Sequence, residues 1–251
     1  MINVLALLVS LIPSILIIIF MFKRNKGNKE YRKACKGALI RGLVCAIPII
    51  FLSLVLYLVN KVIKNALNLS DLAYKAIYNF VVLAFAEEII KYLCFRRTLK
   101  KRKGDYTWTD IVSLMVIVGT AFGLVEDIPY AADANAVTIL VRGLTMGHVG
   151  YGFLMGLLYG KRLESGKKAF GFLALIIPWI LHGMYDFSLT PELININDNL
   201  IFIAISLAVL DIVLVIIMIR FYLKKKEKYQ VLVCHNDVEA NTIDTNFENN
   251  E

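Results

Sequence analysis

Seven long apolar stretches dominate the sequence and restrict the chain to a helical fold within a membrane. A helix needs about 20 mostly apolar residues to cross a bilayer. Stretches of this length lie near residues 3–22, 38–60, 72–95, 110–132, 137–160, 169–189 and 199–223. The hydrophobic share of 58% also exceeds the roughly 45–50% of soluble domains. We therefore predict an all-α polytopic membrane protein with about seven transmembrane helices.

The basic residues alternate between the loops that join these stretches. Residues 23–37 hold seven Lys or Arg, 96–109 hold six, 161–168 hold four and 220–228 hold five, together 22 of the 28. By the positive-inside rule these loops are cytoplasmic, which places the N-terminus outside and the C-terminus in the cytoplasm. Topology thus accounts for the net charge of +8. The lipid bilayer is the expected partner, and no nucleic-acid partner is predicted.

The domain organisation follows from where the apolar pattern stops. Residues 1–228 are predicted to form a single transmembrane domain, in which residues 72–190 carry the polar motifs. After Lys228 the sequence becomes polar and acidic and contains no further Lys or Arg. Residues 229–251 are therefore predicted to be a disordered, acidic cytoplasmic tail.

Four of the apolar stretches contain ionisable residues that a spanning helix does not need. These residues are Glu87, Glu88, Glu126, His148, His182 and Asp186. A charge near the bilayer centre costs roughly 2.5–3.5 kcal/mol, so several in one chain indicate a shared polar site. His148 falls near the middle of the predicted fifth span, about 18 Å from either end at 1.5 Å per residue.

The spacing of these residues suggests how they pair. Glu87 and Lys91 are four residues apart, so they share a helix face and can form an ion pair, whereas Glu88 points about 100° away. This pairing accounts for Glu87 but leaves Glu88 unexplained, as suits a general acid or base. His182 and Asp186 lie one turn apart, where the aspartate can fix the tautomer of the histidine.

A simple depth calculation challenges the idea of one site. Glu87 lies nine residues before Arg96, about 13 Å from the inner boundary, whereas Glu126 lies 16 residues after Asp110, about 24 Å from it. The two carboxylates meet only if the helices tilt or begin inside the cytoplasm. A separation above about 10 Å would exclude a single site.

The ordered motifs resemble those of the PrsW family of intramembrane proteases. The sequence has EEIIK at 87–91, Phe122 four residues before Glu126, the isolated His148, and HGMYD at 182–186. That family is distantly related to the type II CAAX prenyl endopeptidases, which share the glutamate pair and an HxxxN or HxxxD motif. The resemblance covers residues 80–190.

The resemblance implies a multi-pass protease of the bacterial cytoplasmic membrane. Its substrate would be a single-pass membrane protein, an anti-sigma factor, whose cleavage is the first step of regulated proteolysis in a stress response. The six motif residues would then be catalytic.

Two mechanisms suit these residues. In the first, His148, His182 and Glu126 hold Zn²⁺, and Glu87 or Glu88 is the general base toward a bound water. In the second, a glutamate and a histidine polarise the water without a metal, while the other histidine and Asp186 stabilise the oxyanion. The sequence has no HExxH motif, but the number of histidines and carboxylates favours the metal.

Two other functions would also place acids and histidines within the membrane. A proton- or ion-coupled transporter also uses intramembrane acids and histidines, and a protease leaves Arg142 and Asp211 unexplained. However, the sequence shows no inverted repeat. In a membrane scaffold or sensor, the polar groups would serve only helix packing.

Overall fold

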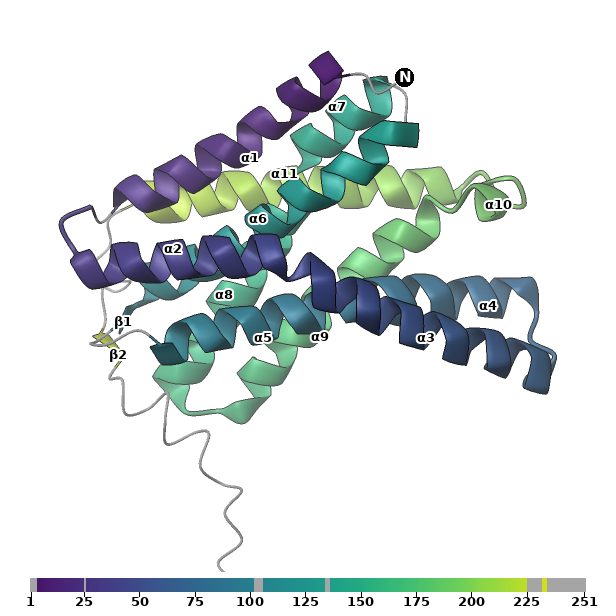
Figure 1. Ribbon diagram of the computed structural model, residues 1–251, viewed down its shortest axis with the longest axis horizontal. Coiled ribbons are helices and arrows are strands. Elements are labelled where there is room, and N and C mark those ends of the chain that lie inside the picture. Colours follow the sequence, from purple (N-terminus) through teal and green to yellow (C-terminus); the bar gives the residue numbers. More distant parts are fainter. Residues whose placement is uncertain (1–3, 25, 102–105, 134–135, 225–231, 234–251) are drawn as a thin grey trace, which may run out of the picture.

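The structure is a computed structural model that describes residues 4–24, 26–101, 106–133, 136–224 and 232–233. Almost all of these residues are helical, and the long helices pack side by side or cross obliquely (Figure 1). The elements are α1 (Val4–Arg24), α2 (Lys29–Val44), α3 (Ala46–Leu67), α4 (Asp71–Ile77), η1 (Tyr78–Phe85), α5 (Ala86–Lys101), β1 (Tyr106–Thr107), α6 (Trp108–Asp133), α7 (Ala136–Thr145), α8 (Gly147–Ser165), α9 (Lys168–Ser188), α10 (Pro191–Ile194), α11 (Leu200–Leu223) and β2 (Leu232–Val233).

Five helical segments within the described residues are long and apolar enough to cross a membrane. They are Val4–Arg24, Lys29–Leu67, Trp108–Pro129, Lys168–Ser188 and Leu200–Leu223. These segments confirm the prediction of an all-α membrane protein. The predicted spans at 72–95 and 137–160 are not among the five, so the total of seven spans and the orientation of the termini stay predictions.

Large apolar side chains cover the outer surface of several helices. Leu5 on α1, Ile47, Ile50 and Phe51 on α3, and Phe202 on α11 are each between 65% and 73% exposed. So large an exposed apolar surface is rare on soluble monomers. In contact with lipid tails, an exposed apolar surface carries no free-energy cost of contact with water.

The predicted span at 72–95 is helical, but its middle is a π-helix. Residues Tyr78–Phe85 form η1, between α4 and the start of α5. π-helical segments occur frequently at functional sites. The indole N–H of Trp179 on α9 donates a hydrogen bond to the carbonyl oxygen of Phe80. This bond fastens α9 to the wide turns of η1, which lead directly into Glu87 and Glu88.

The prediction of one helix over residues 137–160 was wrong. Helix α7 ends at Thr145 and α8 begins at Gly147, because Met146 between them has the left-handed φ of 49°. The two helices have different main neighbours: α7 packs chiefly against α1, whereas α8 packs chiefly against α6 and α9. His148 therefore lies in the first turn of α8, not in the middle of a helix.

Helices α6 and α8 form the centre of the fold, and most of the first four turns of α6 are fully buried. Their backbones come very close: a Cβ on Gly119 would lie only 2.5 Å from the carbonyl oxygen of His148. Glycines at such contacts allow the backbones of two membrane helices to approach this closely. This contact sets His148 against α6, which carries Glu126.

The two short strands form a minimal antiparallel pair. Tyr106 pairs with Val233 and Thr107 with Leu232. These two partners belong to the segment predicted as a disordered tail. The remaining residues of that segment, 229–231 and 234–251, lie outside the described residues.

Candidate active site

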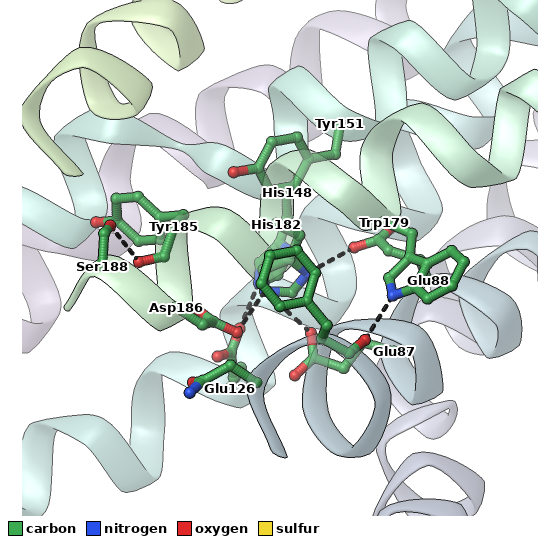
Figure 2. A network of polar contacts seen from close by, with 12 residues as sticks. Glu87, Glu88, Glu126, His148, Tyr151, Trp179, His182, Tyr185, Asp186 and Ser188 are labelled. Carbon is green, nitrogen blue, oxygen red and sulfur yellow. Dashed lines mark hydrogen bonds and ion pairs between the residues drawn. The ribbon is translucent and has the colours of Figure 1, made fainter. Parts of the chain in front are cut away.

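The residues predicted for the site converge from four helices, and Figure 2 shows their side chains turned toward a common centre. They are Glu87 and Glu88 on α5, Glu126 on α6, His148 on α8, and His182 with Asp186 on α9.

Lys91 lies between the two glutamates of α5. Its Nζ is 2.6 Å from Glu88 Oε1 and 3.5 Å from Glu87 Oε2, so the predicted pairing with Glu87 is confirmed. Glu88, which this pairing left unexplained, also contacts Lys91, because residues at i+3 and i+4 are both neighbours on a helix. Lys91 and Glu88 are each 1% exposed. Glu87, with the longer contact, is the less engaged carboxylate of the pair.

His182 connects the glutamate pair to Asp186. Its Nδ1 lies 2.9 Å from Glu88 Oε1. Its Nε2 lies 3.4 Å from Asp186 Oδ2 and 3.8 Å from Glu87 Oε2. The predicted contact between His182 and Asp186 is thus present. Carboxylates on both sides of the imidazole hold its ring in one orientation.

His148 joins the same network through Lys91. Its Nδ1 lies 3.1 Å from Lys91 Nζ, and its Nε2 contacts Glu126 Oε2. Because an ammonium group only donates, Nδ1 accepts from Lys91 and the Nε2–H group donates to Glu126. The rings of His148 and His182 are 5.4 Å apart. Both histidines therefore meet at the glutamate pair.

Glu126 reaches the site because α5 and α6 both extend beyond the apolar stretches of the sequence. Helix α5 continues to Lys101, 14 residues beyond Glu87, and α6 begins at Trp108, 18 residues before Glu126. Measured from the helix ends, the difference in depth is about 6 Å, instead of the about 11 Å obtained from the sequence. Glu87 and Glu126 line one pocket. The objection to a single site is thereby removed.

Four of the side chains form a group with the geometry of a metal site. One ligand atom each from Glu87, Glu88, His148 and His182 can be chosen so that all lie within 4.8 Å of one another. Two imidazoles and two carboxylates are donors that zinc accepts, and a catalytic zinc takes three such ligands and leaves its fourth position to water. Glu126, predicted as a ligand, instead approaches the site through His148.

Arg142, which the sequence left unexplained, also lies at this site. Arg142 Nη2 is 3.1 Å from Glu126 Oε1, and its Nε is 3.3 Å from Asp127 Oδ1. The arginine thus holds one oxygen of Glu126 while the other contacts His148. The signal in the sequence was the presence of an arginine within an apolar stretch, but nothing there identified its partner.

Asp211 on α11 contacts the site through Tyr151. Its Oδ2 is 3.5 Å from the hydroxyl of Tyr151, whose ring stacks on His182 with centroids 5.4 Å apart. Asp211, Tyr151 and His182 line one pocket together with Arg142 and Glu126. Both unexplained charges of the sequence are therefore part of the same site.

A family model described as PrsW family intramembrane metalloprotease matches residues 31–219. The chain belongs to this PrsW family. Proteins named Protease PrsW are similar to it: one from Clostridioides difficile is 28% identical over 190 residues, covering 71% of this chain and 75% of the relative. One from Shouchella clausii is 25% identical over 201 residues, covering 73% and 82%. One from Bacillus subtilis is 25% identical over 183 residues, covering 71% and 79%. No solved structure matches.

The PrsW match extends beyond the motifs that suggested it. Residues 31–219 include most of α2, all of α3 and most of α11, whereas the motif resemblance covered residues 80–190. Asp211 thus lies in the part of the chain that the family shares. Together with the apolar helices, membership of the PrsW family makes the chain a multi-pass membrane protein of bacterial type and a protease.

Proposed function

We propose that the chain is an intramembrane endopeptidase that uses Glu87, Glu88, His148 and His182 to hydrolyse a peptide bond of a membrane-anchored protein. The observation that carries this proposal is the convergence of two carboxylates and two imidazoles within 4.8 Å, from three helices of a membrane protein. Membership of the PrsW family supports a protease. It disfavours the transporter and the scaffold.

We propose further that the enzyme is a metalloprotease. Glu88, His148 and His182 would hold the metal, which would supply a Lewis acid and a more acidic water. Lys91 Nζ lies among the donor atoms, close to Glu88 Oε1 and His148 Nδ1. Its positive charge opposes a second cation there, so metal binding requires Lys91 to give up part of these contacts.

The protein side chains have separate tasks in this proposal. Glu87, the less engaged carboxylate, accepts a proton from the attacking water at Oε2. Asp186 and Tyr151 keep the ring of His182 in place. Glu126 orients His148 through Nε2. In the alternative mechanism without a metal, the same carboxylate activates the water, and a histidine stabilises the oxyanion.

The substrate would reach this site sideways from the lipid. An apolar pocket lies between α3, η1 and α6, and it contains Glu87 and Glu126 among apolar neighbours. The α3 side chains around it, such as Ile50, face outward. A single transmembrane segment fits such an entrance. We propose that the substrate is an anti-sigma factor, cleaved in the first step of a stress response, as the motif resemblance implies.

The test of the protease is a cleavage assay in cells. A tagged single-pass membrane protein is coexpressed with the wild type, Glu88→Ala, His182→Ala or the control Glu164→Ala, which alters a carboxylate outside the site. We expect cleavage by the wild type and the control only. Cleavage that persists in both site variants would contradict the assignment.

The metal is tested separately on purified protein. We expect about one equivalent of zinc in the wild type and little in His148→Ala, with activity lost in a strong chelator and restored by zinc. An active enzyme without metal would support the glutamate and histidine mechanism instead.

A further inference from the structure

We propose that a basic pocket between α2 and α5, outside the candidate active site, binds the phosphate group of an anionic phospholipid. The residues that line it are Glu30, Lys33, Ala34, Gly37, Arg41, Thr98 and Lys101. Three of them are positively charged and one is negatively charged. The pocket lies near the ends of both helices where the apolar sequence gives way to basic residues.

The guanidinium of Arg41 is held in a fixed position in this pocket. Its Nη1 donates a hydrogen bond of 3.2 Å to Thr98 Oγ1, and the Thr98 hydroxyl donates to the carbonyl oxygen of Cys94. Thr98 is 2% exposed. A Cβ at position 37 would lie 2.7 Å from Arg41 Nη1, so Gly37 leaves the space that this group occupies. The other guanidinium N–H groups remain available for an anion.

The positive charge of the pocket is only partly balanced. Among the residues that the structure describes, no carboxylate forms an ion pair with Lys33, Arg41 or Lys101. Arg97 on the same helix as Thr98 adds a like charge that acts on Arg41. Glu30 opposes this charge from the rim of the pocket. A phosphate would pair with the guanidinium in the bidentate geometry that arginine favours.

The surroundings identify a lipid as the source of the phosphate. On α2, Val44 lies one turn beyond Arg41 and is 52% exposed; on α5, Leu93 lies two turns before Lys101 and is 47% exposed. Acyl chains would cover these side chains while the headgroup occupies the basic pocket. Basic pockets between membrane helices bind anionic headgroups in this way. A free phosphate would leave the apolar surface unused.

The test compares lipid binding to purified full-length variants by native mass spectrometry in a neutral detergent. One variant combines Lys33→Gln, Arg41→Gln and Lys101→Gln. The control combines Lys161→Gln, Lys167→Gln and Lys224→Gln, which removes the same charge elsewhere. The probes are short-chain phosphatidylglycerol, short-chain phosphatidylcholine and inorganic phosphate.

We expect phosphatidylglycerol to bind the wild type and the control variant equally, and phosphatidylcholine to bind both more weakly. Binding to the pocket variant should be roughly 100-fold weaker, because each basic residue near an anionic lipid contributes about a fivefold factor. Equal binding to the pocket and control variants would overturn the proposal. Inorganic phosphate that binds the pocket as tightly as the lipid would overturn the assignment to a phospholipid.

Gly37→Ala provides an independent variant in case the triple substitution does not fold. It keeps every charge but places a methyl group against Arg41 Nη1. We expect weaker binding of phosphatidylglycerol than in Gly27→Ala, whose Cβ would meet nothing within 4 Å. Unchanged binding in Gly37→Ala would contradict the role of Arg41.

Discussion

Replacement of Lys91 by methionine is predicted to destabilise the metal-free protein strongly while keeping the volume of the side chain. Lys91 Nζ lies 2.6 Å from Glu88 Oε1, 3.5 Å from Glu87 Oε2 and 4.6 Å from the centre of the Phe122 ring. With Lys91 and Glu88 each 1% exposed, water cannot replace the lost partner. Removing one member of a buried ion pair costs about 3–5 kcal/mol, because the other charge stays buried without compensation.

A double-mutant cycle shows whether this cost comes from the ion pair. Lys91→Met with Glu88→Gln removes both charges, so the double variant should be more stable than Lys91→Met alone, with a coupling energy of at least about 2 kcal/mol. The free energy of unfolding is measured in mixed micelles by titration with a denaturing detergent. The matched control is Lys161→Met with Glu164→Gln, an exposed pair at 2.7 Å, for which we expect a coupling below about 1 kcal/mol. Additive effects of Lys91→Met and Glu88→Gln would refute this account of Lys91.

Two further substitutions test how the histidine of α8 is held. Arg142→Gln removes the 3.1 Å contact to Glu126. It should lower kcat about 10- to 100-fold with a smaller change in KM, as is usual when the support of a site residue is lost. An unchanged kcat would show that Arg142 has no positioning role. Gly123→Ala places a Cβ 3.0 Å from His148 Cδ2. The steady-state rate of cleavage should therefore fall well below that of the control Gly27→Ala. Equal rates in these two variants would contradict close packing around the imidazole of His148.

The convergence of the candidate site residues could be predicted from the sequence because burial of charge in a membrane is costly. Glu87, Glu88 and His182 have no reason to lie in apolar stretches unless they serve a common site. The spacing of His182 and Asp186 also predicted their contact correctly. Periodicity alone gives this contact, since neighbours on one helix are determined by 3.6 residues per turn.

Contacts between helices could not be predicted in the same way. Met146 has a left-handed backbone between α7 and α8, and Tyr78–Phe85 form a π-helix. Both features depend on the packing of these segments against neighbouring helices. A local pattern does not contain that information, so His148 was placed in the middle of a helix. The contact of Arg142 with Glu126 joins residues 16 apart on two different helices, α7 and α6. The pairing therefore became visible only in three dimensions.

The calculated difference in depth between Glu87 and Glu126 was too large because the end of α5 was placed too early in the sequence. The apolar stretch near Arg96 ends before the helix does, since α5 continues to Lys101. An error of five residues corresponds to about 7.5 Å along a helix, comparable to the size of the whole cluster. Hydropathy marks the lipid-facing length of a helix, while the relative height of two side chains depends on the helix ends and tilt.

The central claim is that Glu87, Glu88, His148 and His182 hydrolyse a peptide bond within the membrane. The most direct measurement uses purified protein in liposomes with a single-pass substrate and identifies the cleaved bond by mass spectrometry. We predict one cut in or next to the transmembrane segment, formed by the wild type and Glu164→Gln but not by Glu87→Gln or His182→Asn. An identical cut formed at the wild-type rate by both site variants would contradict the account.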